Sequence, residues 1–185
     1  MLNVVVYAGA RMGDDSEYGL QAQRLAYLLA VSGCKLIYGG GGKGLMGTLG
    51  RTAIAHGGCT VGVTTHNLKI TEELVKEYVS ELHVVSTLME RKNKMFEMAD
   101  IVVALPGGVG TLEELLEVWS GWHLGLHNKP IFLLNPCGFW NPFIDWITSL
   151  AEKGFVRSSP LLLPDVYSTA DELVDSILVR ITSKQ

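Results

Sequence analysis

The amino-acid sequence predicts an α/β fold in which a doubly wound, largely parallel sheet has helices on both faces. Short, β-branched apolar runs bounded by glycine or proline recur along the chain, and stretches of helical character lie between them. Strands that are apolar throughout are typical of a sheet buried on both faces, and their alternation with helices is typical of βαβ units. Since no linker or shift in composition divides residues 1–185, we expect a single domain.

Six apolar runs are expected to form the strands, namely Asn3–Tyr7, Lys35–Tyr38, Thr60–Thr64, Leu82–Val85, Ile101–Leu105 and Pro130–Leu134. Apolar residues at helical spacing predict helices over Glu17–Val31 and Thr111–Leu124. Ligands of such sheets bind outside the carboxyl ends of the strands, so the segments that follow each strand are the places to look for a site.

Capping-box patterns, in which a threonine is followed three residues later by a glutamate, predict helix starts at Thr87, Thr111 and Thr169. The last of these opens a helix over Ala170–Thr182. We expect a longer surface connection over Gly154–Pro164 before it.

The charge of the chain disfavours two classes of partner. With 15 Lys and Arg residues against 19 Asp and Glu residues, the formal net charge is −4. Nucleic-acid polymers and anionic membranes attract basic surfaces, so we expect neither as the partner. No apolar run approaches the roughly 18 residues of a membrane-spanning helix, and the first residues do not resemble a signal peptide. We therefore expect a cytoplasmic protein.

A glycine-rich stretch over residues 39–47 follows the second strand and contains G-x-G-x-x-G twice. No Asp or Glu occurs between Lys43 and Glu72, where a dinucleotide-binding fold places its ribose-binding acid. Lys43 also lacks the Ser or Thr that follows it in a Walker loop. Two interpretations of this stretch remain. It is either a turn that lets a helix pack closely, or a loop whose backbone approaches a ligand, with Gly40 and Gly41 as candidate contacts.

A second glycine-rich loop, Pro106–Thr111, follows the fifth strand and leads directly into a helix. Proline stops the strand, and the free amides of the helix N-terminus carry a partial positive charge, so the sequence predicts an anion site. Thr111 either caps the helix or donates its hydroxyl to a phosphate. Glu114 accordingly has a structural reading as the capping-box partner.

Two further segments supply cations at the carboxyl ends of strands. The loop Gly9–Gly13 follows the first strand, and a basic cluster over residues 87–94 follows the fourth. Clustered charges usually form a solvated face. In this place, however, Arg91 is able to point inward while Lys92 and Lys94 stay in water.

These residues resemble a known family. The run from Pro106 to Glu114 fits P-G-G-x-G-T-x-x-E, and Arg91-Lys92 precede it at the expected spacing. The chain resembles the LONELY GUY (LOG) family of cytokinin riboside 5′-monophosphate phosphoribohydrolases, often labelled lysine decarboxylases. Further matches extend the resemblance roughly from Gly9 to Val156, at Tyr18, Tyr38-Gly39-Gly40-Gly41, Gly44-Leu45-Met46-Gly47, Ala99-Asp100, Lys129-Pro130 and Gly138-Phe139-Trp140.

The resemblance implies a Rossmann-like fold, a homodimer, and hydrolysis of an adenosine 5′-monophosphate, often N6-substituted, to free base and ribose 5-phosphate. It implies Arg91 and Glu114 as the catalytic pair. Phosphate and substrate contacts would come from Gly107, Gly108, Gly110 and Thr111, with Gly40, Gly41 and Lys92 as further candidates.

The chain departs from the family pattern at four places. Gly9-Ala10-Arg11 stands where relatives commonly have Gly-Ser-Ser, and Met89 stands where they often have His. Val109 replaces a frequent aromatic residue, and relatives often have a proline near Thr65. These departures concern the pocket wall and the phosphate contacts rather than the reaction.

Other functions have weaker support in the sequence. Pyridoxal-phosphate chemistry needs a Schiff-base lysine in a cofactor pocket, whereas Lys43 lies in a glycine turn and Lys92 and Lys94 are expected to be solvated. The histidines and cysteines give no convincing metal-ligand spacing, so we expect no metal and no cofactor. The main alternative is a non-catalytic nucleotide or pterin-cofactor carrier on the same scaffold. Its ligand would gain nothing from a carboxylate at Glu114 beside a phosphate.

Overall fold

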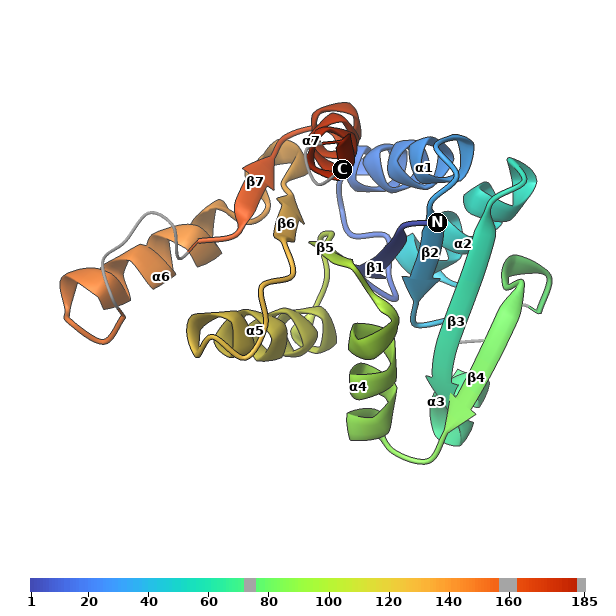
Figure 1. Ribbon diagram of the computed structural model, residues 1–185, viewed down its shortest axis with the longest axis horizontal. Helices are drawn as coiled ribbons and strands as arrows, with labels where there is room; N and C mark the ends of the chain where they lie inside the picture. Colours follow the sequence, from blue (N-terminus) through green and yellow to red (C-terminus); the bar gives the residue numbers. More distant parts are fainter. Residues whose placement is uncertain (72–75, 157–162, 183–185) are drawn as a thin grey trace.

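The computed structural model describes residues 1–71, 76–156 and 163–182, and its strands form one seven-stranded sheet (Figure 1). The order across the sheet is β4-β3-β2-β1-β5-β6-β7, and each of these neighbouring pairs is parallel. The strands are β1 (Asn3–Tyr7), β2 (Lys35–Tyr38), β3 (Cys59–Thr65), β4 (Glu81–Val85), β5 (Ile101–Ala104), β6 (Ile131–Leu134) and β7 (Asp165–Tyr167). The predicted α/β fold with a doubly wound, Rossmann-like parallel sheet is therefore confirmed.

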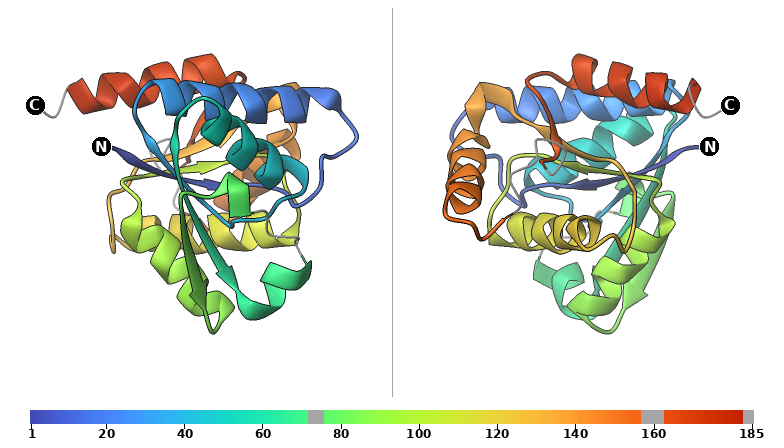
Figure 2. Two further views of the ribbon diagram at one scale, coloured as in Figure 1. Left: turned by 90° about the vertical axis from the view of Figure 1, so that its right-hand side faces the viewer. Right: turned by 60° about the vertical axis from the view of Figure 1, so that its left-hand side comes forward.

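Helices cover both faces of the sheet (Figure 2). They are α1 (Ser16–Val31), α2 (Gly44–Ala55), α3 (His66–Thr71), α4 (Leu88–Met98), α5 (Val109–His123), α6 (Asn141–Glu152) and α7 (Ala170–Thr182). One apolar cluster joins the sheet to α1, α2 and α7, and a second joins its other face to α4, α5 and α6. Among the described helices, none is long and apolar enough to cross a membrane.

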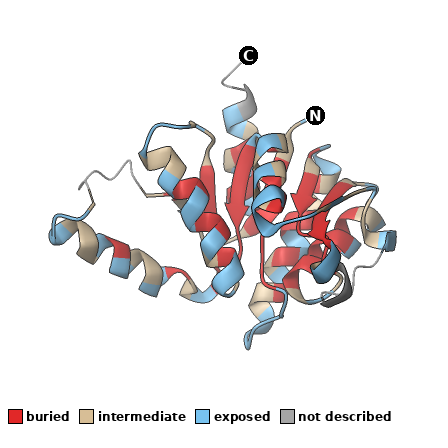
Figure 3. Ribbon diagram, turned by 90° about the horizontal axis from the view of Figure 1, so that it is seen from below, coloured by how far each residue is buried: buried red, intermediate tan, exposed pale blue. Residues whose placement is uncertain are grey.

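The central strand β1 explains why the sheet is covered on both sides. Its side chains alternate between the two apolar clusters, with Val4 and Val6 in one and Val5 and Tyr7 in the other. All of these side chains are buried, as the red strands at the centre of Figure 3 illustrate. A strand with apolar side chains on both faces is stable only when both faces are covered, because exposure of either face would leave apolar area in water.

The predicted strands agree with the observed strands β1 to β6 to within one residue at each end. The short strand β7 was missed because its three residues form no apolar run. It follows the expected connection Gly154–Pro164, of which residues 157–162 lie outside the described part of the chain. The predicted helix Ala170–Thr182 is confirmed as α7.

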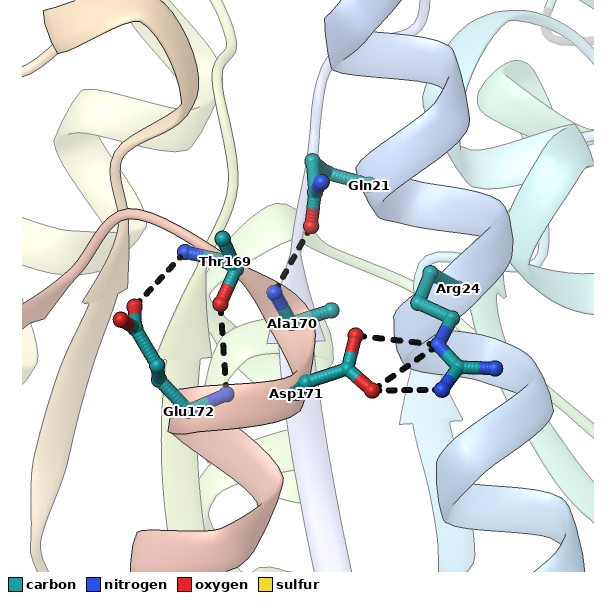
Figure 4. A network of polar contacts seen from close by, with 6 residues as sticks. All are labelled: Gln21, Arg24, Thr169, Ala170, Asp171 and Glu172. Atoms are coloured by element: carbon teal, nitrogen blue, oxygen red, sulfur yellow. Dashed lines mark hydrogen bonds and ion pairs between the residues drawn. The ribbon is translucent and has the colours of Figure 1, made fainter.

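The start of α7 is held against α1 by a polar network (Figure 4). Thr169 and Glu172 form the predicted capping box, with Glu172 N–H donating to Thr169 Oγ1 at 3.3 Å and Thr169 N–H donating to Glu172 Oε2 at 3.2 Å. The first N–H of α7 donates to Gln21 Oε1 at 2.7 Å. Arg24 hydrogen-bonds both carboxylate oxygens of Asp171, which lowers the pKa of Asp171. The sequence-distant helices α1 and α7 are thereby joined on one face.

Candidate active site

A cavity of about 490 Å³ lies at the carboxyl ends of β1 and β5, where the strand order reverses. Connections leave this point toward opposite faces of the sheet, so a crevice remains between them. The loops after the two strands touch, because Gly9 N–H donates to the Pro106 carbonyl at 3.1 Å. The cavity brings together most of the predicted site residues, namely Arg91, Gly107, Gly108, Gly110, Thr111 and Glu114.

Arg91 and Glu114 form an ion pair in the wall of this cavity. Arg91 Nη1 lies 3.1 Å from Glu114 Oε1, and each side chain is only 10% exposed. Arg91 Nε donates to the carbonyl of Val63 on β3 at 2.9 Å, which fixes the guanidinium to the sheet. The predicted helix start at Thr87 is confirmed: Thr87 Oγ1 accepts from Glu90 N–H at 3.1 Å, while Glu90 Oε2 accepts from Ser86 N–H at 2.9 Å. This cap sets where α4 begins and so where Arg91 lies. Burying two charges costs free energy that their attraction recovers only in part, so such a pair in a cavity is a candidate for catalysis.

The protein around this pair is a weakly solvating environment. Tyr7 at the end of β1 is buried, and its burial together with the negative charge of Glu114 raises the pKa of Tyr7. The Tyr7 hydroxyl therefore stays protonated at neutral pH. In such surroundings electrostatic interactions are stronger than in water, which increases what a charged side chain contributes to a reaction.

The N-terminus of α5 opens onto the same cavity, and it differs from the sequence prediction. The helix begins at Val109 with Gly108 as its N-cap, and no side chain in the described part of the protein caps it. Thr111 is therefore a buried residue inside the helix, and the predicted capping box of Thr111 and Glu114 is wrong. Glu114 instead accepts from Arg91, a partner that lies on α4 and that local spacing does not reveal. The first amides of a helix lack intrahelical partners, and three of the residues that carry them here, Gly108, Gly110 and Thr111, line the cavity.

The glycines of the Pro106–Thr111 loop differ in what surrounds them. A Cβ on Gly107 would lie 2.1 Å from Thr111 Oγ1, so the packing of the loop excludes any side chain there. Among the described residues, no atom lies within 4 Å of a Cβ on Gly108 or Gly110, and neither glycine has a positive φ. Packing within the described part of the chain therefore does not require glycine at these two positions. Their missing side chains keep space free at the cavity, beside the helix amides.

The glycine-rich stretch 39–47 packs against residues that line the cavity. A Cβ on Gly39 would lie 2.1 Å from Arg91 Nη2, so the guanidinium occupies the space that a side chain would fill. Gly44 has a φ of +58°, and a Cβ there would lie 2.3 Å from the backbone of the loop after β1. A Cβ on Gly47 would lie 2.1 Å from the carbonyl oxygen of Gly42. Close packing, the first of the two interpretations of residues 39–47 given above, thus explains why Gly39, Gly44 and Gly47 are glycines.

The first amides of α2 have hydrogen-bond partners in another loop of the chain. The amides of Leu45 and Met46 both donate to the carbonyl of Gly9, at 3.0 and 3.3 Å. They are therefore engaged within the chain. Gly40 and Gly41 are buried and lie outside the lining of the cavity.

Lys92 also lies outside the cavity lining. Its ammonium group binds Glu113 and lies 2.7 Å from Glu117 Oε2, and these hydrogen bonds raise the pKa of Lys92. The expectation that Lys92 stays in water is corrected by its side chain, which is only 16% exposed. Its observed role is to join α4 to α5 beside the Arg91–Glu114 pair.

Several residues that line the cavity have no predicted role in the site. Tyr18 and Phe139 match the family pattern, and their rings meet edge to face with centroids 5.6 Å apart. Met12 and Asp14 also line the cavity. Their signal in the sequence was their place in the segment directly after the first strand. The cavity thus has an aromatic and apolar part beside the charged pair.

The chemistry available at this site is that of a carboxylate, a guanidinium and backbone amides. Among residues 1–71, 76–156 and 163–182, no three His, Cys, Asp or Glu side chains are grouped so as to hold a metal ion. Opposite charges side by side are suited to a reaction in which positive and negative charge develop on neighbouring atoms.

Comparisons with known proteins show the family to which the chain belongs. A family model described as "Possible lysine decarboxylase" matches residues 46–177. A cytokinin riboside 5′-monophosphate phosphoribohydrolase of Rhodococcoides fascians is 40% identical over 168 residues, covering 89% of this chain and 85% of that protein. The enzyme of the same name, LOG, from Oryza sativa subsp. japonica is 40% identical over 171 residues, covering 92% of this chain and 70% of that protein.

Among solved structures, the molybdenum cofactor carrier protein from Chlamydomonas reinhardtii has a TM-score of 0.73 at 20% identity and covers 98% of each chain. At that identity the likeness establishes the fold alone. The sequence relatives are twice as similar and also cover most of the chain. The chain therefore belongs to the LOG family of cytokinin riboside 5′-monophosphate phosphoribohydrolases.

Proposed function

We propose that this protein hydrolyses the N-glycosidic bond of AMP or an N6-substituted AMP, giving the free base and ribose 5-phosphate. One observation carries the proposal: the buried Arg91–Glu114 pair and the uncapped start of α5 face the same cavity. The first supplies charges for the reacting atoms, and the second supplies amides for a phosphate. Family membership at 40% identity supports the same reaction.

The charges suit the transition state of this hydrolysis. When the bond between C1′ and the base breaks, the sugar becomes oxocarbenium-like and the departing base takes the electron pair. In our proposal the Glu114 carboxylate stabilises the positive sugar and accepts a proton from the attacking water. Arg91 donates hydrogen bonds toward the leaving base. A guanidinium is too weak an acid to deliver its proton, so the base takes one from solvent.

The phosphate acts as a handle remote from the broken bond. In our proposal it lies against the amides at Gly108, Gly110 and Thr111, where the helix carries a partial positive charge. Its binding energy positions the sugar beside Glu114 and so contributes to the rate rather than only to affinity.

A carrier function is the second candidate, since the fold is shared with a molybdenum cofactor carrier protein. The buried carboxylate favours the enzyme. A carrier only has to hold its ligand, and a carboxylate paired with Arg91 adds nothing to the binding of an anion, whereas a hydrolase needs that carboxylate to accept a proton from water.

The proposal predicts that the protein consumes AMP far faster than adenosine. Chromatography of the products after incubation with a panel of nucleoside monophosphates, AMP and N6-substituted AMP included, should reveal free base and ribose 5-phosphate. Adenosine, the matched control, lacks only the phosphate that the α5 amides are proposed to hold. Equal rates on AMP and adenosine would remove the role given to this loop, and the absence of any free base across the panel would favour the carrier.

We also propose that the active form is a homodimer, in which the two protomers contact each other through the first residues of α4 and α5. Leu88 and Met89 are 57% and 68% exposed, and Val109 beside the cavity is 84% exposed. Large apolar side chains exposed around a site are typical of a protein contact.

Light scattering after size-exclusion chromatography should therefore report twice the 20.2 kDa of the chain. The double substitution Leu88→Glu and Met89→Glu should give the monomer. A wild-type protein that runs as a monomer at working concentration contradicts the dimer.

A further inference from the structure

The charged groups described so far do not neutralise the phosphate of the proposed substrate. The lining of the cavity includes the charged residues Arg11, Asp14, Arg91 and Glu114. Arg91 and Glu114 are engaged with each other, and their charges cancel. A phosphate monoester carries a charge of about −1.5 to −2 at neutral pH, whereas a helix N-terminus supplies only about +0.5. The amides of α5 therefore neutralise only part of a bound phosphate.

Arg11 is the cation that remains at this cavity. It is exposed, and within the described residues its guanidinium has no hydrogen bond or ion pair to a protein carboxylate. Asp14 lies three residues further along the same loop, and its carboxylate repels an anion. Among the described residues that line the cavity, Arg11 is therefore the one whose side-chain charge is available to a phosphate.

The backbone that carries Arg11 is fixed against the phosphate loop. Gly9 N–H donates to the Pro106 carbonyl, and a Cβ on Gly9 would lie 3.3 Å from Gly107 Cα. On the other side, the close approach of Gly44 leaves no space between α2 and the Arg11 amide. The loop is thus held between α2 and the Pro106–Thr111 turn, and the long Arg11 side chain starts next to that turn.

We propose that Arg11 is a second phosphate-binding group, which pairs with the 5′-phosphate that the amides of α5 hold and sets the preference for nucleotide over nucleoside. This proposal rests on the proposed function for its substrate. Of the parts of AMP, only the phosphate is charged, and the planar guanidinium matches two phosphate oxygens at once. The amides of α5 still position the phosphate when the charge of Arg11 is removed, so the loss of Arg11 should weaken binding more than it slows the chemical step.

The test replaces Arg11 by glutamine, which keeps hydrogen-bond donors but removes the charge, and by lysine, which keeps the charge but not the fork. Arg11→Gln should raise the KM for AMP about tenfold, with much less change in kcat, because an exposed charge-assisted contact is worth about one factor of ten. The KM of Arg11→Lys for AMP should lie between the values of the wild type and Arg11→Gln. Arg51→Gln is the control, since Arg51 is exposed on α2, outside the cavity lining and stacked over Tyr78.

A second measurement does not depend on catalysis. Calorimetric titration with ribose 5-phosphate should give a Kd about tenfold higher for Arg11→Gln than for the wild type, and the difference should shrink at 1 M salt, where exposed charges are screened. If Arg11→Gln matches the wild type both in KM for AMP and in this Kd, the assignment of Arg11 is overturned while the proposed function stands. If the wild type hydrolyses no nucleotide but Arg11→Gln still weakens ribose 5-phosphate binding, the proposed function fails and the phosphate role of Arg11 stands.

Discussion

Replacement of Glu114 by glutamine is expected to lower the turnover of AMP by about 10²-fold or more, the loss typical when a positioned acid–base group is removed. Glutamine keeps the size of the side chain and an oxygen that accepts from Arg91 Nη1, which lies 3.1 Å away in the wild type. It carries no negative charge and accepts no proton from water. Ribose 5-phosphate should still bind, because the amides of α5 are untouched. Steady-state rates and calorimetry on the same preparation measure both effects.

The neighbouring Glu113→Gln variant is the matched control for Glu114→Gln. Glu113 lies on the same helix, but its side chain is 55% exposed and binds Lys92 outside the cavity lining. Its loss should leave turnover nearly unchanged, and circular dichroism spectra should be similar for all three proteins, with a lower melting temperature for Glu114→Gln because the buried Arg91 loses its counter-charge. Full activity of Glu114→Gln would mean that the Arg91–Glu114 pair is only structural. Equal inactivity of the wild type and the variant on every nucleotide would support the carrier instead.

Replacement of Gly39 by alanine is expected to reduce activity by about 10²-fold although Gly39 is not among the residues lining the cavity. The new methyl group would lie 2.1 Å from Arg91 Nη2 and 2.8 Å from Met46 Sδ, so the guanidinium has to move. A displacement of about 1 Å in a catalytic group is enough for such a loss. Overpacking of this kind also lowers the free energy of unfolding by about 1–3 kcal/mol, which denaturant titration measures.

A double-mutant cycle with Arg91→Lys shows whether the loss in Gly39→Ala acts through Arg91. Lysine has no second terminal nitrogen to meet the methyl group. If Gly39→Ala acts by displacing the guanidinium, the double variant should be little worse than Arg91→Lys alone. Multiplication of the two losses would instead mean that Gly39 acts independently of Arg91, and would contradict this explanation.

Local patterns predicted the elements where the partners of a residue lie close in sequence. The helix caps at Thr87 and Thr169 are present because their hydrogen-bond partners lie within about one helical turn. Each threonine accepts from the N–H of the glutamate three residues later, while Glu172 accepts from Thr169 N–H and Glu90 from Ser86 N–H. The same pattern at Thr111 failed, because Glu114 has a stronger partner in Arg91, 23 residues earlier in the chain. Spacing within a motif therefore did not distinguish a helix cap from a member of a buried ion pair.

The parallel sheet was predictable from the sequence, because apolar β-branched runs and their spacing reflect burial on both faces, and the P-G-G-x-G-T-x-x-E pattern was enough to predict the family. Which of the glycine-rich segments faces a cavity became clear only from how the segments pack in three dimensions. Gly39, Gly44 and Gly47 make room for Arg91 and for neighbouring backbone, whereas Gly108 and Gly110 leave open space beside the α5 amides. The physical reason is that a missing side chain looks the same in the sequence whether its space is filled by the protein or left for a ligand.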